Sequence, residues 1–176
     1  MVSPFRRAPE FISMVLAFAN ASAAPELETR SGFIECGGSH VRARAECYAK
    51  THYCTSETLS FARQAARTIV PLHPHQGTHE LKDRAKVRAL DYSASSWACV
   101  PGKHGGRYLL VDLSSAGGGN CRQCEYSRLY DLNGRLIAAS LGFDTKGRAH
   151  DHRAGEQTMR RVLGEDGRYT FHDVYR

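Results

Sequence analysis

Two pairs of histidines are the first residues in this sequence whose type and spacing could support chemistry. Each pair is separated by a single residue, and a further histidine follows the first pair. In an extended segment alternate side chains point to the same side, so each pair could present two imidazoles to one metal ion. Three protein ligands with one open position would let zinc activate a water molecule at neutral pH. The candidate metal ligands are His73, His75, His79, His150 and His152.

The surroundings of these histidines argue against a metal site. Pro74 and Gly77 place the first pair in a segment rich in residues that interrupt helices and strands. The spacing of the histidines also matches no HExxH motif. A metal-dependent hydrolase or nuclease, with zinc as its cofactor, is therefore the alternative hypothesis, and the main hypothesis requires no cofactor.

Six cysteines are the second chemical feature of the chain. An even number of cysteines in an exported protein predicts up to three disulfides. Such bonds form in oxidising compartments rather than in the cytosol. The clustering of the cysteines predicts one disulfide within residues 36–54 and at least one that joins Cys99 to Cys121 or Cys124. The six residues are Cys36, Cys47, Cys54, Cys99, Cys121 and Cys124.

Cys121 and Cys124 form a CxxC motif, which in other proteins serves redox chemistry or zinc binding. A redox-active CxxC places its first thiol at the N-terminus of a helix, where the helix dipole stabilises the thiolate. Residues 125–130 follow the motif and have the pattern of a strand instead. The sequence contains no second CxxC that would complete a four-cysteine zinc site. We therefore interpret both cysteines as members of the disulfide framework.

Residues 1–23 have the three parts of a secretory signal peptide. Arg6 and Arg7 give a positive start, residues 11–19 are mostly apolar, and residues 21–23 are the small residues that a signal peptidase recognises. The apolar stretch is much shorter than the roughly 20 residues that span a bilayer. The sequence predicts an exported protein, located in the periplasm or outside the cell, without a transmembrane segment in the mature chain.

Length and composition fit a single globular domain. The chain has 176 residues, of which 41% are hydrophobic. We expect a linker at residues 24–31 and one domain at residues 32–176.

The formal net charge of +6 favours encounters with anionic surfaces. Because the basic residues are scattered, we expect a solvated basic surface rather than a nucleic-acid-binding site.

Residues 32–47 and 56–70 have two different apolar patterns. In residues 32–47, a Gly-Gly turn follows residues 32–36, and apolar and polar side chains alternate in residues 41–47 after it, which predicts a hairpin. A helix capped by Ser39 is the alternative for part of this segment. In residues 56–70 the apolar side chains recur at helical spacing and Pro71 follows them, which predicts a helix.

From residue 87 onward the pattern is that of an antiparallel β-meander. Apolar-rich runs alternate with turn residues, and Asn133-Gly134 favours the positive φ angles of a tight hairpin turn. A second helix is expected at residues 155–163 and a closing strand at 168–175. The expected meander strands are 87–92, 96–100, 107–113, 125–131 and 135–140. The predicted fold class is α+β: an antiparallel meander of about five to six strands with one or two packed helices, held by disulfides.

The main functional hypothesis is a small exported binding protein of the cell envelope. No catalytic motif is assembled in the sequence, and loops carried on a rigid sheet are common recognition surfaces. Such a protein could be an inhibitor, or an immunity protein against a toxin or a wall-degrading enzyme. Its partner would be another exported protein. The candidate contact residues, chosen for their expected exposure, are Lys103, His104, Arg107, Arg122 and Tyr126.

Overall fold

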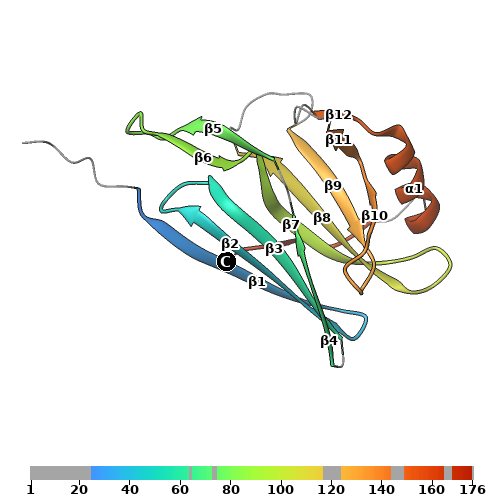
Figure 1. Ribbon diagram of the computed structural model, residues 1–176. Coiled ribbons are helices and arrows are strands. Elements are labelled where there is room, and N and C mark those ends of the chain that lie inside the picture. Colours follow the sequence, from blue (N-terminus) through green and yellow to red (C-terminus); the bar gives the residue numbers. More distant parts are fainter. Residues whose placement is uncertain are drawn as a thin grey trace, which may run out of the picture.

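Two antiparallel sheets dominate the fold (Figure 1). The computed structural model describes residues 25–63, 65–72, 75–116, 124–143, 149–164 and 168–175. The first sheet contains, in spatial order, β1 (Leu27–Cys36), β2 (Ser39–Tyr48), β3 (Cys54–Arg63) and β4 (Ala66–Pro71). The second sheet contains, in spatial order, β10 (Leu136–Ala139), β9 (Glu125–Tyr130), β8 (Arg107–Ser115), β7 (Tyr92–Pro101) and β13 (His172–Asp173).

Two short ribbons and one helix accompany the sheets in the described residues. The ribbons are β5 (Gln76–Glu80) with β6 (Lys86–Leu90) and β11 (Leu141–Phe143) with β12 (Ala149–Asp151), and the helix is α1 (Arg153–Leu163). No helix in this part of the chain is long and apolar enough to cross a membrane. The fold is therefore mainly β. The predicted α+β class is wrong, because the strands form two packed sheets and only one helix is found in the described ranges.

The largest local difference lies at residues 56–70, where a hairpin replaces the predicted helix. β3 pairs with β4 in register, with Leu59 opposite Val70 and Phe61 opposite Thr68. Leu59 and Phe61 are buried, whereas Ile69, which the helical stripe required to be internal, is 57% exposed. The apolar residues of this segment fit both the helical period of 3.6 residues and the strand period of two residues. Pairing of β3 with β2 selects the period of two, since it buries Leu59 and Phe61 against the second sheet.

Other elements agree with the sequence patterns. The hairpin over residues 32–47 is confirmed as β1 and β2, which are joined by Gly37 and Gly38 at positive φ. The strands predicted from residue 87 to residue 140 are found as β6 to β10, with shifts at their ends. The predicted meander is confirmed only for β7 to β10, because β6 pairs with β5 in a separate ribbon. The helix predicted at 155–163 is confirmed within α1. Of the predicted closing strand, only the two residues of β13 pair, with β7.

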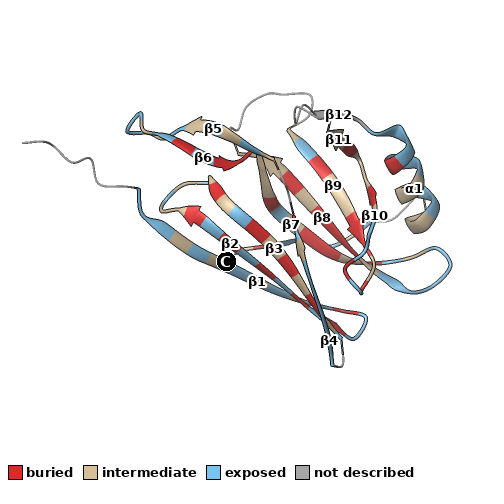
Figure 2. Ribbon diagram, in the orientation of Figure 1, coloured by how far each residue is buried: buried red, intermediate tan, exposed pale blue. Residues whose placement is uncertain are grey.

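The second sheet is buried on both faces (Figure 2). One face packs against the first sheet, where Leu59 and Phe61 meet Trp97 of β7 among the core residues. The other face packs against α1, whose Met159 and Val162 cover a second cluster of buried residues. Three layers result: the first sheet, the second sheet and α1. This arrangement explains why three successive residues of β8, 109–111, are all buried.

Disulfides connect the elements at two places in the described chain. Cys36 of β1 is bonded to Cys99 of β7, so this bond joins the two sheets. Cys47 is bonded to Cys54 across the loop between β2 and β3, as the clustering within residues 36–54 predicts. Cys124 is also disulfide-bonded. The expected bond from Cys99 to Cys121 or Cys124 is wrong, because packing of the sheets brings Cys99 beside Cys36.

Gly155 allows α1 to approach β10 closely, and Gly155→Ala tests this contact. A methyl group at this position would lie 1.8 Å from the carbonyl oxygen of Ala139. We expect Gly155→Ala to lower the free energy of unfolding by about 1–3 kcal/mol, although alanine is the better helix former. Gln157→Ala, at an exposed position of the same helix, should change it by less than about 0.5 kcal/mol. Equal urea-unfolding curves for the two variants would contradict this packing.

Candidate functional site

A cavity of about 560 Å³ lies at the end of the first sheet that carries the loop between β2 and β3. Three segments form its walls: the loop at residues 48–53, the turn between β5 and β6 at residues 80–83, and residues 25–26 before β1. Ala116, which follows β8, completes the lining. Cavities of this size are typical of sites for small molecules or for inserted side chains of a partner.

The loop at residues 48–53 is held in one conformation by local bonds. The Cys47–Cys54 disulfide closes it. Inside it, the Tyr48 amide donates to the Tyr53 carbonyl at 2.9 Å. The Thr51 hydroxyl donates to the Tyr48 carbonyl at 2.8 Å and accepts from the Tyr53 amide at 3.1 Å. A loop that is ordered before binding loses little conformational entropy when a ligand arrives.

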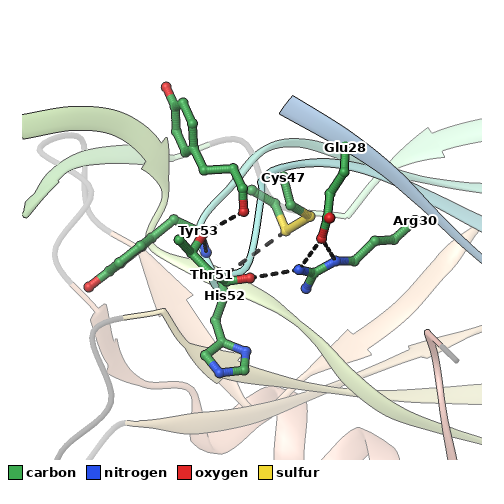
Figure 3. A network of polar contacts seen from close by, with 8 residues as sticks. Glu28, Arg30, Cys47, Thr51, His52 and Tyr53 are labelled. Atoms are coloured by element: carbon green, nitrogen blue, oxygen red, sulfur yellow. Dashed lines mark hydrogen bonds and ion pairs between the residues drawn. A yellow bond between two sulfur atoms is a disulfide. The ribbon is translucent and has the colours of Figure 1, made fainter. Parts of the chain in front are cut away.

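A side-chain network on β1 supports the same loop (Figure 3). Arg30 donates to the Thr51 carbonyl oxygen at 2.8 Å, and its guanidinium is paired with the carboxylate of Glu28. The imidazole of His52 and the ring of Tyr53 point away from this network. The network therefore supports the loop backbone and leaves these two side chains available at the cavity.

Aromatic residues connect the β5–β6 ribbon, which forms the second wall of the cavity, to the loop at residues 48–53, which forms the first. The Tyr48 hydroxyl donates to the carbonyl of Arg88 in β6 at 3.3 Å. The ring centroids of Tyr53 and His79 are 4.8 Å apart. His79 in turn lies 3.3 Å from the carboxylate of Asp91, measured from Nε2 to Oδ1. These contacts hold the β5–β6 ribbon beside the loop, so both walls keep a defined separation.

The charges around the cavity are of both signs. Lys50 and Lys82 contribute positive charge, whereas Glu26, Glu80 and Asp83 contribute negative charge, and all five residues are exposed. Tyrosine, leucine and alanine side chains supply the apolar part of the lining. This combination suits an amphipathic group, such as a side chain with an apolar body and a polar end, better than a highly charged ligand.

A second unusual group is Glu57, which is buried between the sheets. Both of its carboxylate oxygens accept the Ala94 amide at 3.0 Å, and the Tyr175 hydroxyl donates to Oε1. Removal from water raises the pKa of Glu57 to about 7, although the two hydrogen bonds oppose this effect. Burial, followed by the nearby Glu57, raises the pKa of Tyr175. Because Glu57 is only 3% exposed, its role here is structural.

Arg128 on β9 belongs to the same buried region. Its Nη1 donates to the Leu72 carbonyl and lies 3.4 Å from the Tyr130 hydroxyl, and its guanidinium is 5.6 Å from the centre of the Tyr126 ring. Burial raises the pKa values of Tyr126 and Tyr130, while the positive charge of Arg128 lowers them. These contacts connect β9 to the segment after β4.

The predicted histidine ligands do not form one cluster in the described residues. His79 is paired with Asp91, and its ring packs at a tilt against the ring of Tyr53. His152 precedes α1, with Nδ1 3.2 Å from the Ala139 carbonyl oxygen. His73 and the His150 side chain lie outside the described residues. Within that part, no three histidine, cysteine, aspartate or glutamate side chains are placed to share a metal ion.

Three of the predicted contact residues belong to the second sheet and do not line the cavity. Lys103, His104 and Arg107 are exposed at the turn between β7 and β8. The Arg107 side chain lies beside Gly37 in the β1–β2 turn. Tyr126 is only 3% exposed and packs in the core, so the exposure expected for this residue is wrong. Arg122 and Cys121 lie outside the described residues.

The sequence interpretation missed the cavity residues because they come from segments that are separate in the chain. A local signal was nevertheless present: Cys47 and Cys54 enclose six residues that include two tyrosines, a lysine and a histidine. A short loop closed by a disulfide and rich in such side chains is typical of a recognition loop. Comparisons with protein-family models, with curated proteins and with solved structures find no match to this chain.

Proposed function

We propose that the protein is a non-catalytic binding protein of an oxidising compartment outside the cytoplasm, and that it binds another exported protein as an inhibitor or an immunity protein. The observation that carries the proposal is the cavity between the disulfide-closed loop and the β5–β6 turn. The disulfides fit an oxidising compartment. The pattern of residues 1–23 predicts an export signal, and we infer from it a mature protein in the periplasm or outside the cell.

The cavity fits a partner that inserts one amphipathic side chain. Both walls are fixed by bonds within the protein, so the cavity does not need to form during binding. Aromatic side chains that fill such cavities commonly provide a large share of the binding free energy. The exposed charges around the rim would then fix the orientation of the partner, since charges at the edge of an interface act mainly on specificity and association rate.

Site-specific photo-crosslinking in the producing cell tests this function. A photoreactive amino acid at Lys82, in the cavity wall, should form a covalent adduct with one exported protein. The same amino acid at His104, in the β7–β8 turn of the second sheet and outside the cavity lining, should form none. An adduct from His104 alone would assign the partner to the β7–β8 turn and would overturn the cavity as the binding site. Absence of an adduct at both positions would overturn the binding function itself.

Affinity for the protein captured in this way should depend on the cavity residues. We expect His52→Ala and Lys82→Ala each to raise the dissociation constant about 5- to 30-fold, which corresponds to about 1–2 kcal/mol. Both side chains are exposed, so thermal unfolding should be unchanged. His104→Ala is the matched control and should stay within twofold of the unmodified protein in a calorimetric titration. Equal losses in all three variants would contradict a local binding site.

A further inference from the structure

The free edge of β1 has a hydrogen-bonding pattern that the β1–β2 turn determines. Cys36 pairs with Ser39 across the two-residue turn, and two residues at this separation can pair only by exchanging both backbone hydrogen bonds. The pairs alternate along an antiparallel ladder, and the β1–β2 register contains no shift. Gly32 and Ile34 therefore bond to β2. The amide and carbonyl groups of Ser31, Phe33 and Glu35 point away from β2, toward the open edge.

A groove of about 710 Å³ runs along this edge. It is lined by five consecutive residues of β1, residues 31–35, and by three consecutive residues of the C-terminal segment, residues 172–174. Side chains of successive strand residues point to opposite faces. A groove that contacts all five positions must therefore follow the edge of the strand rather than one of its faces. Trp97 also lines the groove, and Arg42 contributes a charged side chain.

The absence of a side chain at Gly32 allows the C-terminal segment to pack closely against β1. A methyl group on Gly32 would lie 1.6 Å from the carbonyl oxygen of Val174. Val174 is buried, and its amide donates to the carbonyl of Ser95 in β7 at 3.2 Å. The segment thus forms a fixed wall of the groove. Within the described ranges, no residue outside β2 forms a backbone hydrogen bond with residues 31–35.

We propose that this groove receives an extended peptide segment of a partner protein, which adds to the first sheet as a fifth strand beside β1. Unpaired edge groups are the usual template for such strand addition. An added strand would place alternate side chains toward Trp97 and Val174 on one side and toward Phe33 and Arg42 on the other. The matching segment alternates apolar residues with acidic ones, because Glu35 already faces His40 at 3.3 Å whereas Arg42 lies beside the exposed Phe33.

A single segment fits this groove better than a second copy of the chain. Pairing of β1 with β1 of another copy would bring a complete sandwich to the edge, together with its own residues 172–174 beside that strand. A single extended segment needs only the space of one strand beside β1. The groove is separate from the cavity at the β2–β3 loop and shares no lining residue with it, so this inference does not depend on the proposed function.

Proline substitutions test the role of the outward amides. Ser31→Pro removes an outward N–H inside the groove, and Thr29→Pro removes an equivalent N–H on the same edge outside it. The probe is a peptide obtained by selection of a random dodecapeptide phage library on the purified protein. We expect Ser31→Pro to raise the dissociation constant of this peptide at least tenfold. Thr29→Pro and Ser31→Ala, which keep the groove amides, should change it less than twofold.

Amide hydrogen exchange gives a test that does not depend on a variant. With the peptide bound to the unmodified protein, exchange should slow at Ser31, Phe33 and Glu35 and stay unchanged at Gly32 and Ile34. Failure to select a peptide, or protection elsewhere only, would overturn the proposal. Dimerisation in sedimentation experiments that Ser31→Pro abolishes would also overturn it, because a second copy would then be the occupant.

Discussion

Replacement of Cys36 and Cys99 by alanine is expected to lower the free energy of unfolding by about 4 kcal/mol. The bond joins β1 to β7 and closes a loop with a sequence separation of 63 residues. A disulfide that closes a long loop strongly restricts the unfolded chain. Removing the bond therefore raises the entropy of the unfolded chain and stabilises the unfolded state. The same change removes the covalent connection between the two sheets. Urea unfolding of the oxidised protein, followed by fluorescence of Trp97, measures the difference.

The second disulfide provides the matched control for this prediction. Cys47 and Cys54 are separated by only 7 residues, so replacing both by alanine should cost about 2–3 kcal/mol by the same chain-entropy argument. This pair should instead have the larger effect on partner binding, since it closes the loop that lines the cavity. A larger loss of stability from Cys47→Ala with Cys54→Ala than from the Cys36 and Cys99 pair would contradict the inter-sheet role of the Cys36–Cys99 bond.

The stability of the protein is expected to fall by about 3 kcal/mol as the pH rises from 4.5 to 7, through the ionisation of Glu57. Burial raises the pKa of Glu57 from its ordinary value of 4.5 to about 7. Between these pH values Glu57 is protonated in the folded protein and ionised in the unfolded chain. The free energy of unfolding therefore decreases as the pH increases. The contribution of the raised Glu57 pKa to the free energy of unfolding is complete below pH 4.5 and is lost above pH 7.

Glu57→Gln isolates this effect from other titrating groups. The amide cannot ionise, yet its oxygen can still accept hydrogen bonds from Tyr175 and Ala94. The difference in unfolding free energy between the unmodified protein and Glu57→Gln should therefore follow the titration of Glu57 alone. Glu46→Gln, at an exposed position of the neighbouring strand, is the control and should show no such difference. Parallel pH profiles for all three proteins would show that Glu57 is not buried as described.

Tyr175 should set the position of this pH transition. Its hydroxyl donates to the Glu57 carboxylate, a bond that favours the ionised form. Tyr175→Phe should move the transition to higher pH, because it removes this donor and keeps the ring in the core. The shift is measured from the same set of unfolding curves.

Several features of the fold could be predicted because they depend on neighbouring residues. The Gly37-Gly38 turn and the alternation in residues 41–47 indicated the β1–β2 hairpin. The Asn133-Gly134 turn indicated β9 and β10, although of these two residues only Gly134 has a positive φ. The helical pattern before Leu163 indicated α1. Residues 56–70 could not be decided in this way, since their apolar residues fit both periods. Pairing with β2, which lies outside the segment, selects the strand.

The candidate sites depended almost entirely on contacts between distant residues. Neither the burial of Glu57 nor its contact with Tyr175, 118 residues later, has a local sequence signal. The same holds for the bond between Cys36 and Cys99 and for the groove between β1 and the C-terminal segment. The Cys47–Cys54 bond was the exception, because its cysteines are close in the sequence.

The amino-acid sequence alone determined most strands after residue 87, the first hairpin, the helix near the C-terminus and the use of cysteines in disulfides. These follow from periodicity, turn chemistry and residue type, each of which acts over a few neighbouring residues. The tertiary structure alone decided how the strands divide between two sheets, which cysteine meets Cys99, and which surfaces form the cavity and the groove. Those outcomes depend on which strands pack together, a choice governed by the burial of the whole core rather than by any single segment.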